Sequence, residues 1–421
     1  MRCLFVVDDH PISRDAVGGA SIVIRAHLEL LAHWNAEIHL LLLRRPERSL
    51  GFEEFVKARP REWNGVRGWC ASHRIRDLRD AVPSKGLVAA GTRFVSSVRD
   101  PYSLFHIAQD EANTGAVGEV VDSVEPDLIW AEELIPALIA RRARNGVPMV
   151  YGHHDWIWLL LRLSGADGMR GPRGALNARL QRRAEELLVR EVDGCVSAAA
   201  HEADQLAQLN DRVAYLPATY AWPSEELPAS VPSPPRVVHV GGMRAVAGRI
   251  GLERFLEIVW PSVAAAFAMP PELLVVGSMD GATETLRARL AAAEARCSGF
   301  VLDLDSVLRP YDVHVVPWEH RTGSRTRVPL AMRHGQVVVS TRAAVDGLTG
   351  LVDGRNCVLV EHLHEMSNAI RSLLRDDARR REIGRSARET FLAEFTREGV
   401  QPRFDAFMTT LERASSRRGG G

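Results

Sequence analysis

The chain has 421 residues, of which 46% are hydrophobic and 25% are charged, and its formal net charge is zero. This length is enough to bury two hydrophobic cores and is too long for one ordinary domain. The balanced charge argues against a general nucleic-acid-binding surface, which would be strongly basic.

The five cysteines are odd in number, widely spaced and free of any Cys-x-x-Cys pair. This pattern is typical of reduced, buried thiols in a cytoplasmic protein. The apolar core of the first ten residues is too short for a signal peptide and runs directly into Asp8 and Asp9. The longest apolar run, residues 156–163, contains Arg162 and is shorter than a membrane span. We therefore expect a cytoplasmic location.

Strands and helices alternate along the first half of the chain. Continuous apolar runs predict buried strands at residues 3–8, 37–43, 127–132, 148–155 and 194–199. Helical spacing of apolar residues predicts helices over 22–33, 136–144 and 177–192. The segment 45–110 is rich in Arg and Gly and shows no clear period. This alternation predicts a parallel sheet with helices on both faces.

A proline-rich stretch separates this half from the next. Six prolines between residues 217 and 236 predict a semi-rigid connector without regular structure. Strands are then predicted at 237–242, 273–277, 300–304, 313–317 and 337–341. Helices are predicted over 252–266, 284–295, 328–334, 362–394 and 400–413, and residues 415–421 are expected to form a disordered tail. With two such halves, we expect a ligand to bind between the carboxyl ends of their strands.

The loop within residues 318–347 carries the clearest functional signal. It joins a buried strand to a short helix and contains Gly323, Arg321, Arg325 and Arg327. Free backbone N–H groups, the positive end of a helix dipole and fixed charge suit a phosphate-bearing ligand. A solvated, Arg-rich surface turn fits the same spacing equally well.

A series of short motifs covers almost the whole chain apart from residues 45–110. They are Gly18-Gly19, DLIWAE (127–132), HHD (153–155), VDGCVSAAAHEAD (192–204), VVHVGGMRAVAGRIGLERFLEIVWPSV (237–263), LLVVG, GFVLDL, VHVVP, the Gly323 loop, AMRHGQVVVST and Asp346-Gly347-Leu348. In order and spacing they resemble the family 4 (group 1) retaining glycosyltransferases of the GT-B fold. Each motif alone is a weak signal, and the set in register is a strong one.

The resemblance implies an α/β fold of two doubly wound, Rossmann-like domains facing across a cleft. The implied parts are an N-terminal acceptor-binding domain (1–220), a linker (221–236), a C-terminal nucleotide-sugar-binding domain (237–398) and a terminal helix with its tail (399–421). Packing back on the first domain is one option for that helix. The nucleotide sugar is a substrate, so no cofactor is implied, and family members usually work without a metal.

On the acceptor side, Gly18 and Gly19 match the glycine loop that approaches the donor phosphates and the acceptor. Glycine permits close backbone approach and positive φ, so the functional interpretation is favoured over the alternative, an ordinary tight turn. His154 matches the family's catalytic histidine facing the transferred sugar, with Asp155 beside it. His153 is a rival, because adjacent residues at a strand end point to opposite faces. A satisfied buried histidine is the alternative at either position.

On the donor side, the resemblance and the charge of the loop imply one set of binding residues. They are Gly241, Gly242, Arg249, Glu319, Gly323, Ser324, Arg325, Thr326 and Arg327.

The donor motif departs from the family pattern, which usually has two glutamates eight positions apart. Thr322 and Leu330 stand there instead, and a leucine cannot hydrogen-bond the ribose hydroxyls. Glu319 lies three positions out of register and is the candidate replacement. The usual Arg and Lys of the first C-terminal loop correspond to Gly242 and Ala247. The Gly323 loop, which resembles a Gly-x-Arg-x-Lys variant, would supply the diphosphate contacts instead.

Other constellations are weaker. Asp303-Leu304-Asp305 has the spacing of a metal–nucleotide motif, but a strand-end acid pair is favoured. Asp8-Asp9-His10 lacks a further ligand at recognisable spacing, so no metal site is predicted. The Arg-rich stretch 162–183 is compatible with an anionic membrane surface, and the interleaved Glu185 and Glu186 favour a solvated face.

The sequence therefore predicts a retaining, metal-independent glycosyltransferase that moves a sugar from a UDP- or GDP-sugar to a small-molecule acceptor. The altered donor motif suggests an unusual sugar or acceptor, as in specialised-metabolite biosynthesis. The alternative is a non-catalytic GT-B protein that binds a nucleotide sugar or partners an active transferase. Thr322 and Leu330 motivate that alternative.

Overall fold

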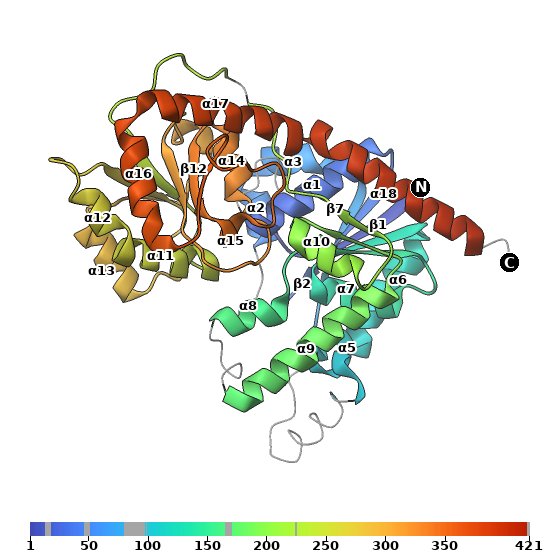
Figure 1. Ribbon diagram of the computed structural model, residues 1–421. Helices are drawn as coiled ribbons and strands as arrows, with labels where there is room; N and C mark the ends of the chain where they lie inside the picture. The colour runs from blue at the N-terminus through green and yellow to red at the C-terminus, as the bar shows by residue number, and fades with distance from the viewer. Residues whose placement is uncertain are drawn as a thin grey trace. The chain divides into compact units, whose positions relative to one another are not determined.

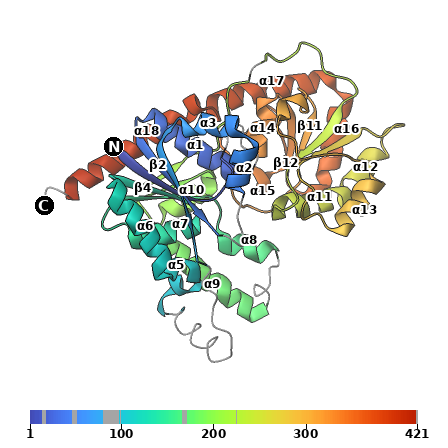
Figure 2. The same ribbon diagram turned by 180° about the vertical axis from the view of Figure 1, so that it is seen from behind.

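The structure is a computed structural model that describes residues 1–12, 18–45, 51–79, 97, 99–164, 171–223 and 225–418. The chain divides into two units. Unit 1 comprises Met1–Pro217 together with Gln401–Gly421, and unit 2 comprises Ala218–Val400. Each unit is built on a parallel sheet with helices packed on it (Figures 1 and 2).

The sheet of unit 1 has seven strands in the described residues, in the order β3-β2-β1-β4-β5-β6-β7. The strands are β1 (Arg2–Asp8), β2 (Glu37–Arg44), β3 (Cys70–Asp77), β4 (Leu128–Glu132), β5 (Met149–His153), β6 (Gly194–Ser197) and β7 (Val213–Tyr215). All neighbouring strands pair in parallel. The central strands are buried on both faces, which explains why they are continuous apolar runs in the sequence.

Helices cover both faces of this sheet. They are α1 (Gly19–His33), α2 (Phe52–Ala58), α3 (Pro60–Arg67), α5 (His106–Gln109), α6 (Glu111–Val124), α7 (Leu134–Ala143), α8 (Ile157–Ser164), α9 (Gly171–Glu191) and α10 (Ala200–Ala207). Apolar residues of α6, α7 and α9 form a core with one face. On the other face, Trp130 contacts His27 of α1 and the rings of Phe404 and Phe407 from α18 (Arg397–Arg418).

The sheet of unit 2 has six strands in the described residues, in the order β10-β9-β8-β11-β12-β13. The strands are β8 (Arg236–Val240), β9 (Glu272–Val276), β10 (Arg296–Gly299), β11 (Val313–Val316), β12 (Val337–Thr341) and β13 (Val358–Val360). The helices are α11 (Val246–Ile258), α12 (Trp260–Ala264), α13 (Glu284–Ala292), α14 (Arg327–Arg333), α15 (Arg342–Val345), α16 (Met366–Arg375) and α17 (Asp377–Glu394). One face of the sheet packs against α11, α12, α13 and α16, and the other carries a smaller apolar cluster that includes Leu330 of α14.

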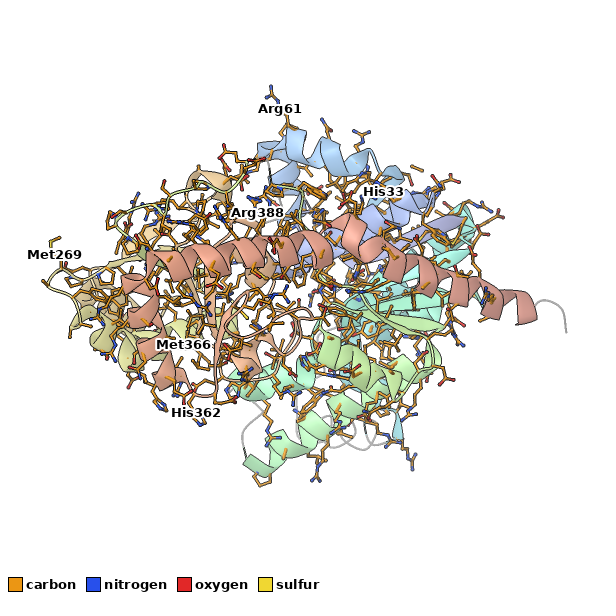
Figure 3. The ribbon with its side chains drawn as sticks, turned by 45° about the horizontal axis from the view of Figure 1, so that its top comes forward. His33, Arg61, Met269, His362, Met366 and Arg388 are labelled. Atoms are coloured by element: carbon orange, nitrogen blue, oxygen red, sulfur yellow. The ribbon has the colours of Figure 1, made fainter. Side chains whose placement is uncertain are left out.

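Polar contacts hold the proline-rich stretch against other parts of unit 2. Arg388 of α17, labelled in Figure 3, donates a 2.8 Å hydrogen bond to the carbonyl of Glu225. The Tyr311 hydroxyl donates to the carbonyl of Pro228 at 2.8 Å, and Arg333 donates to that of Ala221 at 3.0 Å. No helix or strand occurs in the described residues between β7 and β8.

Several expectations about secondary structure are wrong in detail. The predicted strand 300–304 is not a strand, because β10 ends at Gly299 (φ 67°) and Asp303 instead caps a turn through the N–H of Asp305. The predicted helix 252–266 starts earlier and is divided at Val259, next to Pro261. The last helix extends through residues 415–418, which were expected to be disordered.

The expectation about the cysteines also needs correction. Cys3, Cys195 and Cys357 are buried free thiols, whereas Cys297 is exposed. Cys297 lies in β10 at the edge of its sheet, where a strand has a neighbour on one side only.

Candidate active site

The strand order of unit 1 identifies a candidate ligand site at the carboxyl ends of its strands. The chain winds outward from β1 to β3 and then returns to β4 beside β1, so the connections after β1 and β4 diverge. Ligands of doubly wound sheets bind at such a switch point, at the carboxyl ends of the strands. The residues that follow β1, β4 and β5 in this sequence are acids and histidines.

Glu132, the last residue of β4, is the centre of a hydrogen-bond network at the carboxyl ends of the strands. Its fully buried carboxylate accepts from His27 Nδ1 and Trp130 Nε1 through Oε1, both at 2.6 Å, and from His154 Nε2 through Oε2 at 2.6 Å. Gly152 in β5 makes room for it, because a Cβ there would collide with the carboxylate. The network therefore joins α1, β4 and the end of β5.

The Glu132–His154 contact is an ion pair at neutral pH. Burial opposes the charge of both groups, but His27 and His154 hold the pKa of Glu132 well below its usual range. For His154, burial lowers the pKa, while its hydrogen bond to Glu132 and the charges of Glu132, Glu133 and Asp155 raise it to about 9. The side chain of His154 is 11% exposed, and none of the described hydrogen bonds uses its Nδ1. An imidazolium held at Nε2 can donate from Nδ1 to a ligand.

A second acid–histidine pair lies beside the first. His10 Nε2 is 2.8 Å from Glu133 Oε2, and both are partly buried. Glu133 has φ 65° and ψ 165°, a conformation that is costly for a residue with a side chain. Burial and then the charge of Glu133 raise the pKa of Asp8 to about 6, and Asp8 also pairs with Arg45 at 2.8 Å. The carboxyl ends of β1, β4 and β5 thus bring several acids and histidines close together, as active sites do.

His153 and His154 have different environments. His153 is fully buried, lies 5.7 Å from the Tyr151 ring and 4.7 Å from the Trp156 ring, and approaches Glu202 at 3.3 Å. His154 lies past the end of β5 and retains partial exposure. The geometry therefore favours His153 as an interior residue and His154 as the one that can meet a ligand.

The other residues predicted for the acceptor side also follow the carboxyl ends of β1 and β5. Gly18 caps α1 and Gly19 begins it, at the end of the connection from β1, of which residues 13–17 lie outside the described residues. Gly18 has φ −127°, so the expected need for positive φ does not apply there. A Cβ at Gly18 would meet only the Ser21 hydroxyl, at 3.7 Å. Asp155 follows His154 and precedes α8.

In unit 2 the equivalent switch point lies between β8 and β11. Gly241 and Gly242 follow β8, and Gly241 has φ 153°. The guanidinium of Arg327, from the start of α14, lies 3.1–3.2 Å from the position that a Cβ of Gly241 would take. A Cβ at Gly248 would lie 3.5 Å from Arg327 Nη2. Glycine at these positions lets the turn pack directly on the guanidinium.

Arg327 has no carboxylate partner among the described residues. Its one hydrogen bond there runs from Nη1 to His239 Nε2, at 3.3 Å. Burial, and then the charge of Arg325, lower its pKa to about 10, so it remains a cation at neutral pH. A partly buried guanidinium without an opposing charge is a site for an anion, and two planar N–H donors suit a phosphate.

The remaining arginines of this loop are engaged differently. Arg325 donates to the carbonyl and hydroxyl oxygens of Thr322 and lies 6.0 Å from the Trp318 ring centroid. Arg321 forms an ion pair with Asp346 at the surface. Of the three arginines expected to form the anion site, Arg327 has the geometry for it in this structure, and Arg321 does not.

Other predicted donor residues lie on the same loop or on α11. Gly323 has φ 48°, Ser324 is partly buried, and Thr326 caps α14 and accepts from the Tyr220 hydroxyl at 2.8 Å through its carbonyl. Arg249 lies in the first turn of α11 and is partly buried.

The positions that depart from the donor motif have structural roles. Leu330 packs in an apolar cluster with Val238 and Leu308. The Thr322 hydroxyl accepts from Trp318 Nε1 at 3.1 Å. Glu319 Oε2 accepts from Arg254 Nε at 2.5 Å, so one of its two carboxylate oxygens already has a charged partner.

Glu132, His10, His27 and His239 are not among the site residues that the sequence predicts. A signal exists for two of them, because Glu132 ends a buried apolar strand and His239 lies inside one. In the described residues, no group of three or more His, Cys, Asp or Glu side chains could hold a metal ion. Asp305 instead pairs with Arg333. Within the same residues, no helix has the length and apolarity needed to cross a membrane.

Comparison with known proteins supplies the fold and a family for part of the chain. Residues 234–376 match the family described as glycosyl transferases group 1. No curated protein matches the sequence. Among solved structures, sucrose-phosphate synthase from Thermosynechococcus elongatus is 16% identical with a TM-score of 0.67, covering 98% of this chain and 100% of that chain.

Two further structures are similar over nearly full length. HepE of Anabaena in complex with UDP-glucose is 13% identical, with a TM-score of 0.63 and coverage of 97% of this chain and 100% of that chain. A TarM mutant of S. aureus, in complex with Fondaparinux, alpha-GlcNAc-glycerol and UDP, is 9% identical, with a TM-score of 0.63 and coverage of 96% and 99%. Such structures are GT-B glycosyltransferases, and the two parallel-sheet units of this chain have the GT-B fold.

Proposed function

We propose that this chain, with a group 1 glycosyltransferase match in unit 2, is a retaining glycosyltransferase that uses a UDP- or GDP-sugar. The observation that carries the proposal is the Arg327 guanidinium, which packs on the Gly241–Gly242 turn and meets no carboxylate in the described part of the chain. It lies at the switch point of the β8–β11 sheet, where a nucleotide binds in doubly wound folds. The UDP and UDP-glucose in the HepE complexes support the same ligand class.

Arg327 is assigned to the leaving diphosphate. Cleavage of the sugar–oxygen bond leaves negative charge on the departing phosphate, and a fixed cation lowers the energy of that state. A charge-assisted contact of this kind contributes about 1.5–3 kcal/mol. Arg325 and the backbone of Gly323–Arg327 are secondary contributors.

His154 is assigned to the reacting sugar or acceptor. Glu132 holds its Nε2 and keeps it protonated, so that Nδ1 is an oriented hydrogen-bond donor. Gly18, Gly19 and Asp155 complete the acceptor side. Retention of configuration, a small-molecule acceptor, metal independence and a role in specialised metabolism are parts of the proposal.

The test is release of nucleoside diphosphate from a panel of UDP- and GDP-sugars, with and without candidate acceptors and in the presence of EDTA. Turnover that survives EDTA and yields a product of unchanged anomeric configuration by NMR supports the proposal. Inversion would remove the retaining assignment, and loss of turnover in EDTA that Mg²⁺ restores would remove metal independence.

A second candidate is a nucleotide-sugar-binding protein without turnover. The apolar packing of Leu330 favours it, because a leucine supplies no carboxylate for the ribose hydroxyls. Tight binding of a nucleotide sugar with no release of nucleoside diphosphate, across acceptors, would select this candidate.

A further inference from the structure

His239 is a buried imidazole directly beneath the donor-side glycine turn. It lies in β8, two residues before Gly241, and is fully buried. Its Nε2 accepts from Arg327 Nη1, so this nitrogen carries no proton. Burial, and then the positive charge of Arg327, hold the pKa of His239 well below its ordinary value. The partner of Arg327 is therefore neutral.

Three other buried arginines of the chain pair with carboxylates. The side chains of Arg25, Arg236 and Arg380 are 5%, 7% and 1% exposed, and each forms an ion pair with a carboxylate, at 2.8, 2.6 and 2.6 Å respectively. A carboxylate partner satisfies the N–H groups and also cancels the charge. His239 satisfies one N–H group of Arg327 and leaves the charge intact. This difference has no structural benefit, since an unopposed charge near the interior costs free energy.

We propose that His239 is a positioning residue that aims the Arg327 guanidinium at the donor diphosphate through a neutral acceptor. The inference rests on the proposed function and adds a residue to its donor site. The contact fixes Nη1 from the side of the sheet while the Gly241 turn packs against the guanidinium. The orientation and the full positive charge of Arg327 are then both present before the ligand arrives, which reduces the cost of binding it.

The test compares variants at this one position by calorimetry, with UDP, GDP and inorganic pyrophosphate as probes. His239→Gln keeps a neutral acceptor at similar reach and is expected to bind the preferred diphosphate within about threefold of wild type. His239→Glu has the same reach as glutamine and adds a carboxylate that can pair with Arg327, and we expect its affinity for the same probe to fall about tenfold or more. Thermal unfolding monitors whether each variant is folded.

Each result decides the inference. Wild-type affinity in a folded His239→Glu protein overturns it and leaves the proposed function standing. Equal losses in the Gln and Glu variants also overturn it, because they show a need for imidazole shape alone. If the Glu variant does not fold, His239→Leu removes the acceptor without adding charge, and unchanged affinity there overturns the inference. A wild-type protein that binds none of the probes overturns both the inference and the proposed function.

Discussion

Glu132 Oε2 and His154 Nε2 share a 2.6 Å hydrogen bond between the end of β4 and the residue after β5. The carboxylate is fully buried and also holds His27, so its position is fixed from two sides. The other ring nitrogen of His154, Nδ1, is used by none of the described hydrogen bonds and can donate to a ligand. The bond therefore explains how a histidine outside regular structure is both oriented and charged.

Replacing Glu132 by Gln should shift the pH dependence of activity. Glu132 provides the main interactions that raise the pKa of His154 to about 9. Without its charge, the loss of kcat/KM at high pH should move from near 9 toward the ordinary histidine value of about 6.5. A pH–rate profile from pH 6 to 10 measures this, with Glu186→Gln on the surface of α9 as the control. An unchanged alkaline limb in a folded Glu132→Gln protein would contradict the assignment.

His154→Gln should separate catalysis from binding. Glutamine retains an N–H donor for Glu132, so the buried carboxylate keeps a partner and the fold is expected to persist. Loss of the charged imidazole should lower kcat by about a hundredfold or more, with Kd for the nucleoside diphosphate nearly unchanged. His153→Gln is the matched control and should instead lower Tm, since His153 packs between Tyr151 and Trp156. The opposite pattern would identify His153 as the functional residue.

Stability should fall as pH rises from about 6.5 to 9. Burial raises the pKa of Glu185 to about 8, and the pKa of His154 is about 9. In this window the folded protein holds protons that the unfolded chain has released, so the free energy of unfolding decreases with pH. Urea midpoints at pH 6.5, 8 and 9, under reducing conditions, check the sign. Glu185→Gln should flatten the part below pH 8, and a midpoint that rises with pH would refute the prediction.

Restoring a glutamate at Leu330 should not restore a ribose contact. Leu330 is 7% exposed and lies among apolar side chains, so a carboxylate there would be buried without a partner. Leu330→Glu is expected to destabilise the protein by about 2 kcal/mol or more and to leave UDP affinity no better than wild type. Denaturation and calorimetry measure the two effects. Higher affinity at unchanged stability would show that position 330 faces the ligand.

Much of the fold follows from the sequence because central parallel strands are buried on both faces. The strands at residues 2–8 and 337–341 are continuous apolar runs and were identified for that reason. The edge strand Arg296–Gly299 was missed, because its residues are mostly exposed and the apolar run beside it, 300–304, is a turn. Short strands such as Val358–Val360 carry too few residues for a period to be visible.

The site was predictable only in part. Motifs and charge predict His154 and Arg327 as site residues, and their roles are proposals. Their partners Glu132 and His239 are not predicted, because hydrogen bonds across 22 and 88 residues depend on strand order and side-chain direction. The sequence also does not show which arginine of the loop can bind an anion. Arg321 pairs with Asp346, whereas Arg327 has no carboxylate partner among the described residues.

The most direct measurement is calorimetric binding of UDP and GDP to wild type, Arg327→Ala and Arg321→Ala. Both substitutions remove one arginine from the same loop, but only Arg327 lies on the Gly241 turn. We expect Arg327→Ala to weaken binding of the preferred diphosphate about ten- to a hundredfold, and Arg321→Ala to bind it within about threefold of wild type. Equal affinity of wild type and a folded Arg327→Ala protein would contradict this expectation.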